Sequence, residues 1–132
     1  MIIDATYAPL GRLASTVAKL AREGEEVVII NAGNAIFKKD KNFVIRKLVE
    51  SKHKGTPTKG PFTSFSSVEI VKRSIRGMLE RKRKTGRLAK ERIKIYKGVP
   101  DGIDVSKAVR LFETRNNKYP TVEEISKSLG YE

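Results

Sequence analysis

Three apolar segments with different spacings follow one another within the first thirty residues. Ile2 and Ile3 form a short apolar pair, and apolar residues then recur at helical intervals from Leu10 to Ala21. Residues 27–30 are a continuous β-branched run, which is typical of a strand covered on both faces. A strand, a helix and a second buried strand in succession predict a right-handed βαβ unit. The chain is therefore expected to have an α/β fold with a parallel sheet.

Turn and cap residues support this order. Residues 6–9 are read as a turn, and Pro9 suits the first turn of the helix, where a missing N–H costs nothing. Gly24 fits the end of the helix. A further short strand is expected at residues 35–38, and Asp40 is a candidate N-cap for a helix that carries Phe43. Two Gly and two Pro predict a loop over residues 54–64.

The middle of the chain contains a predicted helix with two unlike faces. Ser66 and Glu69 form a capping box, so the helix is expected to run from Ser66 to about Leu79. Its inner face is predicted to contain Val68, Val71, Ile75 and Met78. Its outer face is predicted to contain Lys72, Arg73 and Arg76.

Shorter elements are predicted after this helix. Thr85 is a candidate cap for a short helix that includes Leu88 and Ala89. Residues 93–96 alternate between isoleucine and a polar residue, which predicts a strand with one charged face. Thr121 and Glu124 form a second capping box, and Gly130 fits the end of that helix.

Charge is concentrated in residues 52–97. This segment has fifteen Lys or Arg and three acids, so it carries a net charge of +12 out of +13 for the whole chain. Like charges on one surface repel and lower stability, unless a polyanion neutralises them. Because apolar residues at helical and strand spacing separate these cations, the segment is expected to be a folded basic face that binds nucleic acid.

The distribution of the cations favours RNA over DNA. They lie on a predicted loop, two helices and a strand, whereas none of the common DNA-binding motifs is present. Such a spread suits a folded RNA recognised by shape and backbone. A basic turn is predicted at residues 82–86, and Arg87, Lys90 and Arg92 extend the positive charge into the next helix. Gly77 and Gly86 are expected to leave backbone open to a sugar-phosphate chain.

The sequence lacks the residues that a catalytic site or a metal site would need. The single histidine, His53, has no cysteine or second histidine near it, and the chain contains no cysteine at all. Residues 31–34 follow a buried strand, where nucleotides often bind, but a small turn is the better interpretation because no glycine-rich phosphate motif is present. Asp4 is expected to cap a turn. Phe62 and Phe65 are candidates for base stacking, although anchoring of the loop in the core is favoured for both.

Specific strings resemble the L-thirteen family of large-subunit ribosomal proteins, in its archaeal branch. They occur in the family's order at residues 3–5, 10–15, 28–32, 76–79, 86–87 and 95–100, and the archaeal features are at residues 60–62 and 124–131. The sequence departs from the family at Glu80, where proline is usual, and at Ser64 and Ser66, where arginine and proline are usual. These two serines make RNA contact by that loop doubtful, and Lys54 and Lys59 are expected to compensate.

The resemblance implies a three-layer α/β/α domain with a four-stranded, mainly parallel sheet. It implies a structural and assembly role in the large ribosomal subunit, in the cytoplasm, with ribosomal RNA and neighbouring ribosomal proteins as partners. No cofactor, metal, membrane or small-molecule substrate is expected. The expected organisation is one domain over residues 1–132, with a near-neutral core (1–51), a basic segment (52–97) and a C-terminal extension (98–132).

Thirteen candidate RNA contacts combine the basic face and the resemblance. They are Arg12, Lys54, Lys59, Lys72, Arg73, Arg76, Arg81, Lys82, Arg83, Lys84, Arg87, Lys94 and Lys97. Two alternatives remain beside ribosomal RNA binding. One is a small RNA-modifying or nucleotide-using enzyme with a basic substrate platform, and the other is a DNA-compacting protein.

Overall fold

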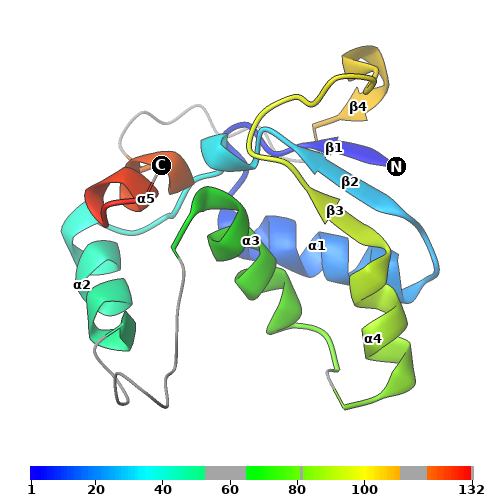
Figure 1. Ribbon diagram of the computed structural model, residues 1–132, viewed down its shortest axis with the longest axis horizontal. Helices are drawn as coiled ribbons and strands as arrows, with labels where there is room; N and C mark the ends of the chain where they lie inside the picture. The colour runs from blue at the N-terminus through cyan, green and yellow to red at the C-terminus, as the bar shows by residue number, and fades with distance from the viewer. Residues whose placement is uncertain (53–64, 81, 111–118, 132) are drawn as a thin grey trace.

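A parallel sheet of four strands forms the centre of the computed structural model, which describes residues 1–52, 65–80, 82–110 and 119–131 (Figure 1). The strands are β1 (Ile2–Asp4), β2 (Val27–Ile30), β3 (Ile93–Ile95) and β4 (Ala108–Val109). Their spatial order is β3-β2-β1-β4, and every pairing is parallel. Together with the five α-helices of the described residues, this sheet confirms the α/β class and is consistent with the expected three-layer α/β/α fold.

The predicted βαβ unit is present at the N-terminus. Helix α1 (Leu10–Arg22) connects β1 to β2, and Ile3 lies opposite Ile29 in the parallel pairing. Pro9 immediately precedes the helix, and Gly24 ends it with a φ of +98°, a conformation that glycine adopts without strain.

The main core lies between the sheet and three helices. These are α1, α3 (Ser67–Arg76) and α4 (Lys84–Glu91), of which α3 and α4 contact β3 and also pack on α1. Ile3, Ile29 and Leu13 are fully buried there, each losing all contact with solvent. Burial of these side chains supplies the main driving force for packing the helices on the sheet.

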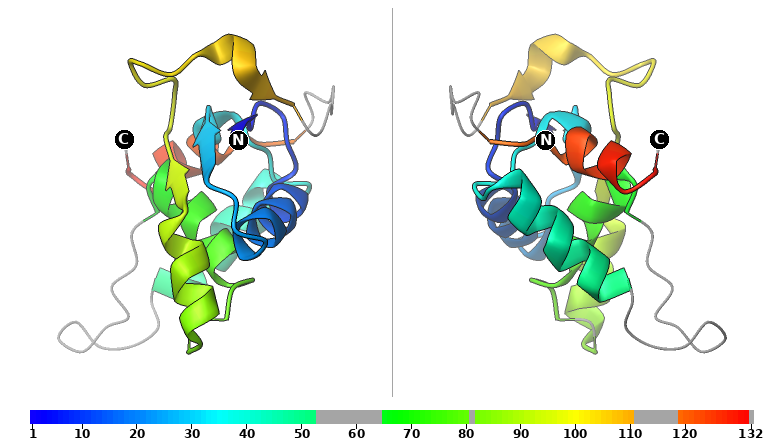
Figure 2. Two further views of the ribbon diagram at one scale, coloured as in Figure 1. Left: turned by 90° about the vertical axis from the view of Figure 1, so that its right-hand side faces the viewer. Right: turned by 90° about the vertical axis from the view of Figure 1, so that its left-hand side faces the viewer.

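Two further helices lie towards the carboxyl ends of the strands. Helix α5 (Val122–Ser128) packs against α2 (Lys41–Lys52), α3 and the short 3₁₀ helix η1 (Ala32–Asn34). Figure 2 shows α2 and α5 on one side of the molecule (right view) and α4 followed by β3 on the opposite side (left view).

The prediction of a strand at residues 35–38 is wrong. Ile36 makes only isolated bridges, one parallel with Pro9 and one antiparallel with Thr121. The segment runs between the start of α1 and the residues before α5, so its backbone groups are satisfied by those neighbours and not by a sheet edge.

The predicted caps are confirmed at two helices and wrong at a third. Ser66 Oγ accepts a hydrogen bond from Glu69 N at 3.4 Å, and Thr121 Oγ1 accepts one from Glu124 N at 3.2 Å. Thr85 does not cap α4, because that helix already begins at Lys84.

The inner face of α3 differs from the prediction at its end. Ile75 is buried as expected, but Met78 is 42% exposed, whereas Leu79 is only 7% exposed. The helix ends at Arg76, and the chain leaves the helical repeat before residue 78. The helical spacing therefore no longer decides which side chain faces the core.

Candidate nucleic-acid interface

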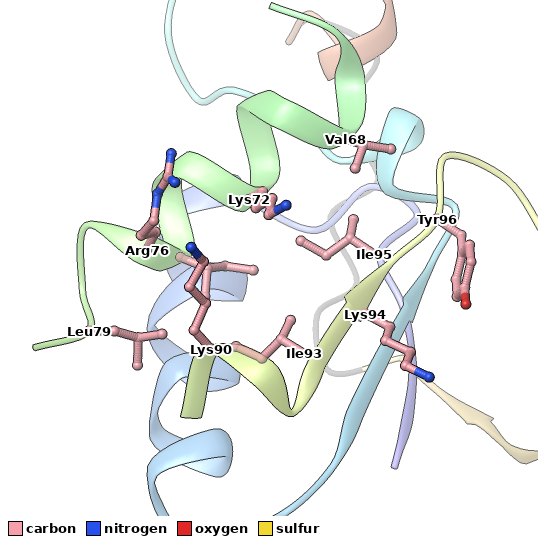
Figure 3. A pocket seen from close by; sticks show the side chains of 10 residues that line it. Val68, Lys72, Arg76, Leu79, Lys90, Ile93, Lys94, Ile95 and Tyr96 are labelled. Carbon is pink, nitrogen blue, oxygen red and sulfur yellow. The ribbon is translucent and has the colours of Figure 1, made fainter. Parts of the chain in front are cut away.

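A hollow of about 280 Å³ lies between α3 on one side and β3 with α4 on the other (Figure 3). Its floor is apolar and consists of Val68, Ile75, Leu79, Ile93 and Ile95. Ile93 and Ile95 occupy alternate positions of β3, so both side chains point from the strand towards α3. Ile93 and Ile95 are partly exposed, because the hollow is open to solvent.

Cations surround this apolar floor. Lys72 and Arg76 come from α3, and Lys90 comes from α4. Lys94 also borders the hollow, but its side chain points to the other face of β3, together with that of Tyr96. None of the ten described residues that line the hollow is acidic. An unopposed group of cations over apolar surface attracts anions that carry an apolar part.

The three cations predicted on the outer face of α3 are not equivalent. Lys72 is exposed, as predicted. Arg73 is half-buried, and its guanidinium lies 5.4 Å from the centre of the Phe65 ring. Arg76 is also half-buried, and its Nε is shielded from solvent with no hydrogen-bond partner among the described residues. The prediction that all three point away from the protein is therefore wrong for both arginines, because long side chains fold back over apolar surface.

A second hollow of about 160 Å³ adjoins the first. It is lined by Arg76, Leu79, Gly86, Arg87 and Lys90. Arg76, Leu79 and Lys90 belong to both hollows. Of the cations that line them, Lys90 alone is missing from the thirteen candidates, although its place three residues after Arg87 indicated a shared helix face.

Gly86 faces the protein and not a ligand, which corrects the prediction of open backbone at this residue. A Cβ atom at this position would meet the backbone oxygen of Glu80 at 1.8 Å. The first turn of α4 thus packs directly on the preceding segment. At Gly77, by contrast, the nearest atom to an added Cβ is 3.5 Å away, which is an ordinary contact.

Gly86→Ala is expected to lower the free energy of unfolding by about 1–3 kcal/mol, because the methyl group forces α4 away from Glu80. Gly77→Ala is the matched control, since its φ of −64° suits any residue, and it should be neutral or slightly stabilising. Urea denaturation of both variants measures the difference. Equal stability of the two variants would contradict the close packing at Gly86.

The remaining candidate contacts are scattered. Lys82, Arg83, Lys84 and Arg87 are exposed in and after the basic turn. Arg83 forms an exposed ion pair with Glu80 at 3.3 Å, which contributes little to stability.

Five more candidates lie away from the hollows or outside the described part. Arg12 is exposed on α1 and lines neither hollow. Lys97 Nζ lies 3.6 Å from the Glu123 carboxylate, which connects the end of β3 to α5. The predictions for Lys54, Lys59 and Arg81, and those for His53 and Phe62, fall outside the described residues.

Arg92 has a structural role, contrary to the prediction that it extends the basic face. Its Nη1 donates a hydrogen bond to the carbonyl oxygen of Ala21 at 2.8 Å. The guanidinium is therefore a second donor to a carbonyl in the last turn of α1, which also accepts a hydrogen bond from Gly24 N at 3.1 Å.

Residues 31–34 have no spare backbone donors for a phosphate. The amide N–H groups of Asn31, Ala32 and Gly33 donate to the carbonyls of residues 98, 96 and 97, respectively. The small turn favoured by the sequence is confirmed as a 3₁₀ helix that connects β2 to the end of β3. The donors that a nucleotide site would need at this sheet edge are already used.

Asp4 caps a turn, as predicted. Its Oδ1 accepts hydrogen bonds from Thr6 N at 3.0 Å, Thr6 Oγ1 at 2.6 Å and Asn31 Nδ2 at 3.2 Å. Its Oδ2 lies 3.3 Å from Arg110 Nε. Burial alone would raise the pKa of this carboxyl, but the hydrogen bonds together outweigh burial and hold the pKa below its usual value. Asp4 is thus ionised at neutral pH, as a cap and not as a general acid.

Phe65 is anchored in the core, the interpretation favoured over base stacking. The ring is fully buried and meets the ring of Tyr131 edge to face, with 6.1 Å between centroids.

Within the described residues, no group of three or more His, Cys, Asp or Glu is placed to hold a metal ion. None of the helices in the described ranges has the length and apolar character that a membrane crossing requires.

Known proteins resemble the chain over almost its whole length. The model of the family described as ribosomal protein L13 matches residues 1–101. Large ribosomal subunit protein uL13 of Methanococcus maripaludis is 40% identical over 98% of this chain and 97% of the relative. The uL13 proteins of Thermoplasma volcanium (37%; 98% and 97% covered) and Archaeoglobus fulgidus (35%; 98% and 87% covered) are similar.

Proposed function

The chain belongs to the ribosomal protein L13 family, and we propose on this basis that it is a structural protein of the large ribosomal subunit that binds ribosomal RNA. It would act through the exposed cations of α3, the turn at 82–83, α4 and β3. The proposed setting is the cytoplasmic ribosome, where neighbouring ribosomal proteins complete its surroundings.

The observation that carries this proposal is the hollow between α3 and β3, whose described lining residues include several cations and no acid. Lys72 and Arg76 reach this hollow from α3, and Lys90 reaches it from α4. The cations on such a surface repel each other, and binding of phosphates removes this repulsion. The near-neutral residues 1–51 supply β1, β2 and α1, against which the basic elements pack.

The proposed contribution to assembly is electrostatic. Phosphates of different RNA helices repel each other when they are brought together. Cations on α3, α4 and β3 lie on separate elements, so they can reach phosphates of more than one RNA helix. Neutralising these phosphates lowers the repulsion that opposes close packing of the RNA.

The relatives do not support an enzyme. The relatives cover 98% of this chain and are named as ribosomal proteins. The amides of residues 31–33 that a nucleotide site would use already have hydrogen-bond partners. A DNA-compacting protein is distinguished by experiment, since it would bind duplex DNA as tightly as structured ribosomal RNA.

Binding of structured ribosomal RNA is expected to depend steeply on salt. If about six to ten cations contact phosphates, the affinity should fall ~10³–10⁵-fold between 50 and 200 mM salt. Filter binding of the purified protein across this range measures the slope, with duplex DNA as the control ligand. Sedimentation in moderate salt tests whether the native protein remains with the large subunit. A flat salt response, or loss of the protein from the subunit, would contradict the proposal.

A further inference from the structure

We propose that the hollow between α3 and β3 receives one unpaired base of the RNA, with an adjoining phosphate bound between Arg76 and Lys90. This inference rests on the proposed function and adds the kind of nucleotide that the basic face recognises. It assigns different tasks to the apolar floor and the cationic border of the hollow.

The size and lining of the hollow suit a single base. Its volume of about 280 Å³ is just below the ~300–1,000 Å³ that sites for drug-sized molecules occupy, as suits a smaller ligand. Leu79 approaches from the α3 side, and Ile93 and Ile95 approach from β3 (Figure 3). Ile75 of α3 also lines the hollow. Bases that leave the stack are commonly held between apolar side chains in this way.

The edge of the sheet can supply polar contacts to the base. In the spatial order of the described strands, β3 is the outermost, beside β2. An outermost strand presents backbone N–H and C=O groups that no further strand pairs with. These backbone groups can form hydrogen bonds with the polar edge of a base. A purely apolar ligand would leave the same backbone groups without partners.

The two hollows meet at the proposed phosphate position. Arg76 and Lys90 line both hollows, so an anion at their junction would contact both cations. The Nε of Arg76 is shielded from solvent and has no hydrogen-bond partner in the described ranges. A phosphate oxygen would therefore meet the terminal nitrogens of this half-buried guanidinium and not its Nε, and guanidinium–phosphate hydrogen bonds are among the stronger ones.

Charge distinguishes a nucleotide from an apolar protein side chain as the occupant. A protein side chain could fill the floor, but it would leave Lys72, Arg76 and Lys90 without a counter-charge. An intact RNA duplex has the opposite difficulty, because its bases are stacked inside the helix. An extruded base is the ligand that brings an apolar ring and a phosphate together.

The test uses the full chain and an RNA hairpin with a one-nucleotide bulge that carries 2-aminopurine. The same hairpin without the bulge is the reference. The native protein should bind the bulged hairpin about tenfold more tightly and change its fluorescence. Ile93→Phe fills the hollow and keeps every cation, so it should abolish this preference.

Leu88→Phe is the matched control, because Leu88 is exposed on α4 and lines neither hollow. It should keep the preference for the bulge. If Ile93→Phe fails to fold in a thermal melt, Val68→Phe fills the opposite end of the hollow and replaces it. Retention of the preference in a folded filling variant would overturn the inference, as would equal binding of both hairpins by the native protein.

Two further outcomes are distinguishable. If the native protein binds neither hairpin at low salt, the proposed RNA-binding function itself is wrong. A photoreactive amino acid placed at Val68 should crosslink to RNA in the assembled large subunit. A crosslink to a neighbouring protein instead would leave RNA binding intact and would overturn the base as the occupant.

Discussion

Replacing Lys72, Arg87 and Lys90 together by glutamine is expected to weaken binding of structured ribosomal RNA by about 100-fold near 0.15 M salt. All three side chains are exposed and line the hollows between α3, α4 and β3. Each lost phosphate contact lowers the salt slope by roughly 0.9, so the variant should also show a slope smaller by about 3. Filter binding as a function of salt measures both quantities.

The fold should survive these substitutions. Glutamine has a helix propensity close to those of lysine and arginine, and removal of three like charges reduces self-repulsion. The melting temperature is therefore expected to be unchanged or slightly higher. Arg73 and Arg76 are left in place, because Arg73 lies over the buried Phe65 ring and Arg76 is half-buried. Their replacement would mix a loss of packing with a loss of charge.

A second variant separates the position of the charge from its amount. Lys19, Lys41 and Arg46 are exposed on α1 and α2, and replacing them by glutamine removes the same three charges. This control should bind RNA within a few-fold of the native protein, since its substitutions lie outside the basic face. Equal loss of affinity in both triple variants would show that net charge, and not the position of the cations on the basic face, drives binding.

Phe65→Ala is expected to produce the largest loss of stability, about 3–5 kcal/mol. The ring is 0% exposed, and it lies against Tyr131 near the C-terminus and the guanidinium of Arg73 on α3. Truncation to alanine leaves a cavity where these segments meet, and both the Tyr131 edge-to-face contact and the Arg73 cation–π contact are lost. Urea denaturation followed by circular dichroism measures the change.

Phe43→Ala is the matched control for this substitution. Phe43 is 40% exposed on α2, so its truncation should change the free energy of unfolding much less than that of Phe65. RNA affinity of the Phe65 variant should fall only to the extent that the protein unfolds. A Phe65 variant that is stable but no longer binds RNA would restore base stacking as the role of this ring.

Local patterns in the sequence were enough to identify several elements of this protein. Helical spacing from Leu10 onward and the β-branched run at residues 27–30 predicted the βαβ unit, and the pairs Ser66–Glu69 and Thr121–Glu124 predicted two helix starts. These features depend on residues within a few positions of each other, because caps and periodicity act over one or two turns of chain. The concentration of positive charge is likewise a property of the sequence itself.

Other features were decided by contacts between distant parts of the chain. Strand β4 has two residues and becomes a strand only because β1 pairs with it, so no pattern in residues 108–109 indicated it. Gly86 is enclosed by Glu80, and Arg92 is drawn to the carbonyl of Ala21, 71 positions away. A charged or glycine residue has the same appearance in sequence whether it faces RNA or its own protein. Tertiary packing makes the difference, because it alone determines which side chains lose solvent and which polar groups must then find a partner within the fold.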